Sequence, residues 1–186
     1  MNSMLTRTVV FVAAGLALGA CTLDQPKTAA APAKKPPAAD YQAPAGPAPN
    51  VPNRAAICYN DADLTTIRAR MIQGQMAVAA LQCQNPGGGR ALEGAYGSFL
   101  SKFNADLTAN GRSLQQLAGR KRFNVDVLVT EFANRTAQRA PVDPEFCSRS
   151  LRALEWGLSP QVTSLSQVPP AYDLGPDMNI HQCAPR

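Results

Sequence analysis

Few side chains in this 186-residue chain could carry out catalysis, and the histidine count already excludes several kinds of site. His181 is the single histidine, and it lies two residues before Cys183, near the C-terminus. Zinc sites built from several histidines are therefore excluded, and a catalytic triad would have one imidazole available. We expect a surface histidine here, with no metal and no cofactor.

Paired carboxylates could hydrolyse glycans, because one acid protonates the leaving group while the other acts as base or nucleophile. Most acidic residues fall at expected helix starts or on polar helix faces, where capping and solvation explain them. A carboxylate-based peptidoglycan hydrolase is therefore the third of three functional hypotheses. The candidate acids are Asp61, Asp63, Glu93, Asp106, Asp126, Glu131, Asp143, Glu145 and Glu155.

Basic residues gather on the expected third, fourth and fifth helical segments and could form a binding surface. Such a surface could contact anionic lipid headgroups, lipopolysaccharide or an acidic protein, although helical arginines ordinarily form a solvated face. The formal net charge of +5 is too mild, and too spread, to predict nucleic-acid binding. The candidate surface residues are Arg112, Arg120, Lys121, Arg122, Arg135, Arg139, Arg149, Arg152 and Trp156, the last being either an interface anchor or a packed side chain.

The N-terminus has the pattern of a secretory signal. Arg7 supplies the positive charge of a short first region, and residues 9–18 form an apolar segment. That segment is too short to span a membrane, which needs about 20 residues as a helix. We therefore expect residues 1–20 to be a cleaved signal peptide. Two interpretations stay open: an ordinary signal peptide with Cys21 as a bystander, and a cytosolic amphipathic N-terminus.

The run Leu18-Gly19-Ala20-Cys21 closes the apolar segment and resembles the lipobox of bacterial lipoproteins. The resemblance implies that Cys21 becomes the mature N-terminus and carries diacylglycerol, often with a third acyl group such as palmitate. Two or more acyl chains hold a protein stably on a membrane. Thr22 stands where inner-membrane lipoproteins often have aspartate, which favours the outer membrane and a domain that faces the periplasm.

Residues 21–57 differ in composition from the rest of the chain, with prolines set among alanines. Such a segment has too little branched or aromatic surface to offset its ordering entropy. We expect a disordered linker with polyproline-II character that acts as a spacer, or alternatively as a stalk that touches the cell wall. The remaining residues, 58–186, suit one domain with one core.

Residues 58–186 carry apolar side chains at helical spacing in several stretches. The pattern predicts an all-α fold, most simply an up-and-down bundle of about four main helices with one short extra helix. From about residue 168 the chain is rich in proline and glycine, and we expect an irregular tail. The first expected helix covers 64–81 and is capped by Asn60 or Asp61, and the second covers 92–107 and stops at Gly111. A short helix follows over 114–117, and a fourth covers 125–133 and is capped by Asn124. The fifth begins at Asp143-Pro144-Glu145, and its apolar face is formed by Cys147, Leu151, Leu154 and Leu158.

The four cysteines after Cys21 are Cys58, Cys83, Cys147 and Cys183, and an even number in an exported chain indicates two disulfides. Cys58 and Cys83 flank the first helix, whose ends lie about 33 Å apart, whereas a disulfide needs Cα atoms within about 7 Å. Two ways of pairing the cysteines remain. In an up-and-down bundle Cys83 and Cys147 lie at one end, and Cys58 and Cys183 lie at the other. We therefore expect the bonds Cys83–Cys147 and Cys58–Cys183. No Cys-x-x-Cys occurs, so structural bonds are expected rather than redox-active thiols.

Together these observations predict a membrane-anchored envelope lipoprotein that acts as a non-enzymatic protein-interaction or structural module. Its expected partners are the membrane, through the N-terminal lipid, and a protein of the envelope. The alternative is a module that binds an anionic envelope lipid or glycan through the arginine-rich helix faces.

Overall fold

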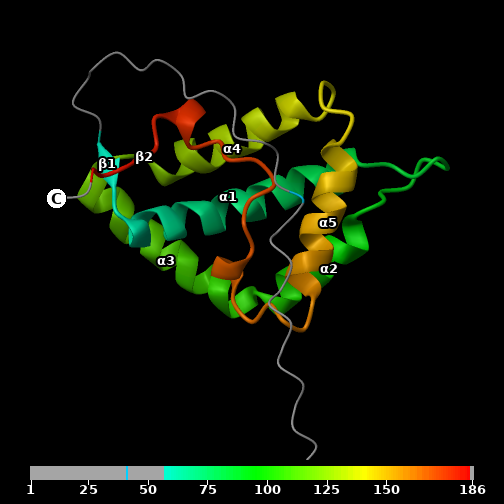
Figure 1. The fold of residues 1–186 in the computed structure, drawn as a ribbon, viewed down its shortest axis with the longest axis horizontal. Helices are drawn as coiled ribbons and strands as arrows, with labels where there is room; N and C mark the ends of the chain where they lie inside the picture. Colours follow the sequence, from blue (N-terminus) through cyan, green and yellow to red (C-terminus); the bar gives the residue numbers. More distant parts are fainter. Residues whose placement is uncertain (1–40, 42–56, 185–186) are drawn as a thin grey trace, which may run out of the picture. The chain divides into compact units, whose positions relative to one another are not determined.

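The fold is that of a computed structural model of the chain, which describes Tyr41 and residues 57–184 (Figure 1). These residues all belong to one compact unit, Pro36–Arg186. The described part is mostly helical, so the predicted all-α class is confirmed. Its elements are β1 (Cys58–Tyr59), α1 (Asp61–Gln82), α2 (Glu93–Lys102), α3 (Asn104–Lys121), α4 (Val125–Arg139), α5 (Phe146–Leu158), the short 3-10 helices η1 (Leu165–Gln167) and η2 (Pro176–Met178), and β2 (His181–Gln182).

Helix α1 is the centre of the domain, with α3 and α4 packed along it and α2 and α5 against each other near its C-terminal end (Figure 1). The Asn60 side chain caps α1 as predicted, because its Oδ1 accepts a hydrogen bond from the Asp63 amide at 2.8 Å. The apolar stripe predicted for this helix is buried except at its last member, Leu81, which is 58% exposed. Its buried apolar members are Leu64, Ile67, Ala69, Met71, Ile72, Met76, Val78, Ala79 and Ala80.

The second predicted helix is divided in two, which corrects the expectation that it runs on to Gly111. The chain turns at Phe103, so that α2 ends at Lys102 and α3 begins at Asn104. Gly111 lies inside α3, because the buried face of that helix continues through Asn110 to Leu114 and Leu117. The separate short helix expected over 114–117 is therefore the second half of α3.

Helix α5 also differs from its prediction, both in its start and in the face that it buries. It begins at Phe146, and Asp143 caps the preceding turn by accepting a hydrogen bond from the Glu145 amide at 2.9 Å. Leu151 is exposed, whereas small residues face the core. A Cβ on Gly157 would lie 3.0 Å from the Phe99 ring, so this glycine lets α5 approach α2 closely. The buried residues of α5 are Phe146, Ser150, Ala153, Leu154 and Gly157.

Both predicted disulfides are present. Cys58 is bonded to Cys183 with their Cα atoms 4.7 Å apart, and Cys83 is bonded to Cys147 with their Cα atoms 5.6 Å apart. The continuous α1 separates Cys58 from Cys83, as the elimination of that pairing required. The first bond joins the two ends of the domain beside the parallel β1–β2 pair, and the second ties the end of α1 to α5.

The C-terminal segment, residues 168–182, is largely irregular as expected, yet it forms part of the core. Its buried side chains include Tyr172, Leu174 and Ile180. The buried Gln75 of α1 bonds the backbone of Tyr172 twice: its Nε2 donates to the carbonyl oxygen at 2.7 Å, and its Oε1 accepts from the amide at 3.3 Å. The disulfide is therefore one of several attachments that hold the tail.

Tyr41 lies within the predicted linker, but its side chain is part of the core and only 1% exposed. Its hydroxyl donates a hydrogen bond to the carbonyl oxygen of Pro169 at 2.8 Å. Tyr41, which precedes the boundary at Cys58 expected from composition, is therefore attached to the C-terminal segment.

Replacing both cysteines of either disulfide by serine should destabilise the oxidised protein without unfolding it. In the chain-entropy model loops of this length contribute at most about 4–5 kcal/mol each to the free energy of unfolding. Urea unfolding followed by circular dichroism would measure the loss for Cys58→Ser/Cys183→Ser and for Cys83→Ser/Cys147→Ser. A Cys58–Cys83 peptide in a non-reducing digest of the wild type would contradict the observed pairing.

Candidate binding groove

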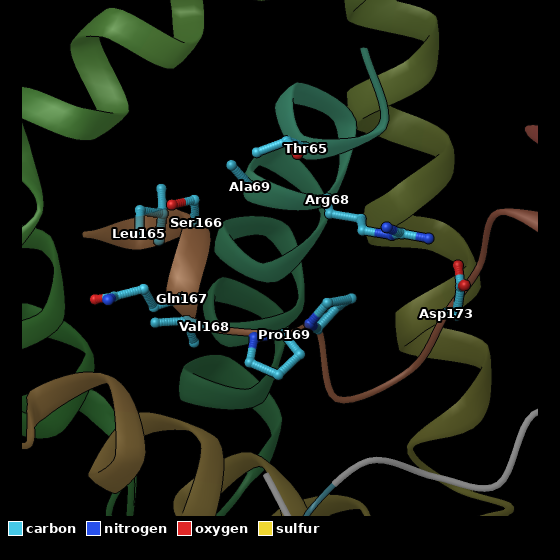
Figure 2. A pocket seen from close by; sticks show the side chains of 10 residues that line it. Thr65, Arg68, Ala69, Leu165, Ser166, Gln167, Val168, Pro169 and Asp173 are labelled. Atoms are coloured by element: carbon cyan, nitrogen blue, oxygen red, sulfur yellow. The ribbon is translucent and has the colours of Figure 1, made fainter. Parts of the chain in front are cut away.

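A groove runs between α1 and the C-terminal segment, and we call it the Arg68 groove. It consists of two hollows of about 320 and 200 Å³, which have Arg68 and Asp173 in common. Figure 2 shows the larger hollow. The larger hollow is lined by Thr65, Arg68, Ala69, residues 165–170 and Asp173. The smaller is lined by Leu64, Ile67, Arg68, Met71, Asp173, Gly175, Pro176, Ile180, His181 and Gln182.

The groove exists because the C-terminal segment covers α1 incompletely. Thr65 and Arg68 are exposed on α1, although buried Leu64, Ile67 and Ala69 lie beside them. The opposite wall includes Pro169 and Pro170, and proline has no amide hydrogen to offer a neighbouring strand. The groove is thus open and walled mainly by side chains.

Arg68 is the charged group of the groove that has no partner. Among the described residues it makes neither an ion pair nor a hydrogen bond. Its side chain extends from α1 in the direction of Asp173 (Figure 2). One oxygen of Asp173 is already engaged, because its Oδ1 accepts from the Gly175 amide at 2.9 Å. Arg68 is therefore available to an external carboxylate.

His181 lies in the smaller hollow and is half-buried rather than on the surface as expected. Its Nε2 atom is buried and has no hydrogen-bond partner among the described residues. No hydroxyl or thiol side chain lines that hollow, so the imidazole has no nucleophile beside it there. Each of the two hollows contains a single carboxylate, Asp173, whereas glycan hydrolysis uses two.

Two of the predicted surface cations hold the domain together instead. Arg120 Nη2 lies 2.8 Å from Asp63 Oδ1, and Lys121 Nζ lies 3.9 Å from the other oxygen of that carboxylate. Lys121 also donates to the carbonyl oxygen of Cys58 at 2.6 Å. Asp63 is 4% exposed, so these contacts neutralise a buried charge and join the end of α3 to the start of α1.

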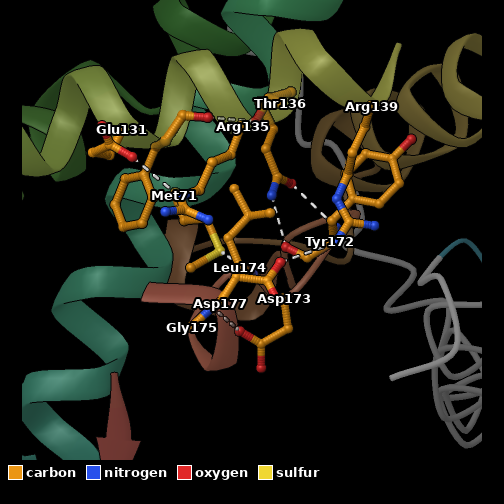
Figure 3. A network of polar contacts seen from close by, with 12 residues as sticks. Met71, Glu131, Arg135, Thr136, Arg139, Tyr172, Asp173, Leu174, Gly175 and Asp177 are labelled. Atoms are coloured by element: carbon orange, nitrogen blue, oxygen red, sulfur yellow. Dashed lines mark hydrogen bonds and ion pairs between the residues drawn. The ribbon is translucent and has the colours of Figure 1, made fainter. Parts of the chain in front are cut away.

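Three further arginines are also paired, and two of them lie over the ring of Tyr172. Figure 3 shows Arg139 beside that ring. Arg139 lies 5.2 Å above that ring and 3.3 Å from Asp177, while Arg149 lies 5.5 Å above the ring and 3.4 Å from Asp143. Burial, with the Asp143 carboxylate as second cause, raises the pKa of Tyr172. Arg135 pairs with Glu131 of its own helix at 3.1 Å.

Of the nine predicted surface residues, Arg112, Arg122 and Arg152 have no ion-pair partner among the described residues. Trp156 is half-buried, and its Nε1 donates to the carbonyl oxygen of Gln167 at 3.2 Å, so it packs against η1. The structure therefore does not unite the nine residues into one free surface.

Cys21, the predicted lipid-attachment residue, lies outside the described residues. Within residues 57–184 and Tyr41, no cluster of histidine, cysteine, aspartate or glutamate could hold a metal ion. No helix in the same part of the chain is both long and apolar enough to cross a membrane.

Sequence reasoning missed the Arg68 groove, because its outer wall comes from a tail that was expected to be loose. One signal was available: Arg68 is a cation placed between Ile67 and Met71 in the apolar pattern of α1. A charged residue in an otherwise buried stripe indicates that no other segment covers the helix at that position, so that its side chain reaches solvent.

Comparison with known proteins adds no relative: no protein-family model matches this chain, no curated protein is similar to it, and no solved structure matches its fold.

Proposed function

We propose that this chain is a lipid-anchored protein of the bacterial cell envelope, and that its domain binds an extended, acidic segment of a partner protein in the Arg68 groove without catalysing a reaction. The observation that carries this proposal is the unpaired Arg68 at the junction of two hollows in an open groove. An arginine there can form a paired, charge-assisted hydrogen bond with a carboxylate of the partner.

The walls suit an extended peptide. Ala69, Val168 and Pro169 offer apolar contact in the larger hollow, and Ile180 offers it in the smaller. A peptide that crosses both hollows would pass Arg68 midway. The groove is also firmly supported, because Gln75 fixes its outer wall to α1 and the Cys58–Cys183 disulfide fixes the end of the C-terminal segment beside β1. A wall that is ordered beforehand lowers the entropic cost of binding.

The membrane anchor rests on the lipobox resemblance at Cys21. Two disulfides in so small a domain agree with an oxidising compartment, which is where an exported lipoprotein resides. A lipid anchor on the outer membrane would place the domain in the periplasm, within reach of envelope proteins.

The alternative, binding of an anionic lipid or glycan through the arginine faces, has less support. Five of its eight proposed cations, Arg120, Lys121, Arg135, Arg139 and Arg149, are paired within the domain. A salt-sensitive association with anionic vesicles, lost on replacing Arg112, Arg122 and Arg152, would favour it.

Site-specific photo-cross-linking in cells would test the groove. A photoreactive residue at Ser166, which is exposed and lines the larger hollow, should capture a discrete protein; the same residue at Gln138, which is exposed on α4, should not. Arg68→Glu should abolish the Ser166 product, because it places like charge against the partner's carboxylate. Arg112→Glu, the matched charge reversal on the exposed face of α3, should leave the product unchanged.

A product that survives Arg68→Glu, or one captured equally from Ser166 and Gln138, would contradict the groove as the binding site. Circular dichroism of each variant, which should match the wild type, would show that the loss reflects binding rather than misfolding.

Membrane fractionation would test the anchor. Cys21→Ala should move the protein from the membrane fraction to the soluble periplasmic fraction, because it removes the residue that would carry the proposed lipid anchor. Mass spectrometry of the wild-type N-terminus should find Cys21 acylated. A Cys21→Ala protein that stays with the membrane would show that the lipid is not its anchor.

A further inference from the structure

A third hollow, of about 340 Å³, lies on nearly the opposite side of α1 from the Arg68 groove. Residues two apart on a helix point about 200° apart, so Arg70 faces away from Arg68. No residue lines both sites. The hollow, which we call the Arg70 site, is lined by Arg70 of α1, by Gly111, Leu114 and Gln115 of α3, and by Val125, Asp126, Val129 and Thr130 of α4.

Arg70 is half-buried and lacks an anionic partner. Its Nη1 donates to Gln73 Oε1 at 2.8 Å, while its Nε is buried with no hydrogen-bond partner among the described residues. No described carboxylate lies within ion-pair distance of it, although Asp126 lines the same hollow. Burial lowers the pKa of Arg70, yet a guanidinium remains protonated at neutral pH. The site thus contains a partly desolvated positive charge that the protein does not neutralise.

Helix α3 packs against this guanidinium. A Cβ on Gly111 would lie 3.4 Å from Arg70 Nη2, an ordinary van der Waals distance, so Gly111 and the Arg70 side chain are direct neighbours. The neighbouring Asn110 is 8% exposed, and its Nδ2 donates to the carbonyl oxygen of Thr66 at 2.8 Å. Its Oδ1 is buried and has no partner among the described residues. Buried polar atoms without partners are rare in folded proteins, and Arg70 Nε is one that belongs to a residue lining the site.

The walls limit the kind of anion that fits. Leu114, Val125 and Val129 are apolar, so they favour a ligand with an apolar body. A single arginine matches one negative charge, and its planar fork matches a carboxylate. The exposed Asp126 carboxylate would repel a dianion such as phosphate.

We propose that the Arg70 site binds a monocarboxylate that carries an apolar group, with Arg70 paired to the carboxylate and the side chains of α3 and α4 around the apolar part. A small organic acid and the C-terminus of a polypeptide both have this chemistry. The site goes beyond the proposed function, because it shares no residue with the Arg68 groove and does not depend on the anchor.

The test uses the full chain with Cys21→Ala and both disulfides formed, and it follows the Nε–H resonance of Arg70 by NMR. Sodium hexanoate should shift this resonance in a saturable way and bind at least tenfold more tightly than hexanamide, its neutral isostere. Acetate, which lacks the apolar body, and inorganic phosphate should bind more weakly than hexanoate. A second comparison distinguishes a polypeptide C-terminus from a small organic acid as the ligand. N-acetyl-Ala-Leu, with its C-terminal amide as the neutral control, is titrated in the same way. If the peptide acid binds more tightly than hexanoate, the ligand is a polypeptide C-terminus; if it binds more weakly, the ligand is a small organic acid.

Arg70→Gln should abolish hexanoate binding, while Arg112→Gln, which removes an exposed charge from α3, should leave it unchanged. Asp126→Asn keeps Arg70 and should tighten hexanoate binding by about twofold or more, because it removes a like charge; this variant decides the question if Arg70→Gln does not fold. Equal binding of hexanoate and hexanamide, no shift at Arg70, or no tightening in Asp126→Asn would overturn the proposal.

Discussion

The structure depends on the burial of α1, which is apolar around most of its circumference and must be covered on several sides. Helices α3, α4 and α5 cover part of it, and the C-terminal segment covers much of the remainder. The polar Gln75 shows how complete this burial is, since it is 0% exposed and satisfied by the backbone of Tyr172. The proline-rich tail is therefore a wall of the core, and the Arg68 groove lies where that wall leaves α1 uncovered.

Charge in this domain is used mainly to hold its elements together. Asp63 joins α1 to α3 through Arg120 and Lys121, and Arg139 and Arg149 enclose Tyr172 of the tail. Arg68 and Arg70 of α1 form no ion pair among the described residues, as is also true of Arg112, Arg122 and Arg152. The two arginines of α1 each line a hollow that could hold a carboxylate, one suited to an extended protein segment and the other to a compact apolar acid.

Much of this fold could be predicted from the sequence, because helix caps follow from local rules and helix length and topology limit which cysteines can pair. Asn60 and Asn124 cap their helices as expected, and helix length alone excluded a Cys58–Cys83 bond. The errors arose where tertiary packing decides. Gly111 suggested a helix end but lies inside α3, whose buried face continues to Leu114 and Leu117, and α5 buries small residues such as Gly157 that carry no apolar signal. The tail and Tyr41 could not be placed, because their order comes from partners about a hundred residues away.

Amide hydrogen exchange at Tyr172 tests the central claim most directly, namely that the C-terminal segment is an integral wall of the core and so can form a binding groove. Its amide donates to the buried Gln75, so it should exchange as slowly as the core amides of α1. It should remain protected in Cys58→Ser/Cys183→Ser, where the covalent tie to the tail is absent. Exchange at the rate of an unstructured peptide in the wild type would contradict the account, because the tail would then be loose and the groove would have no wall.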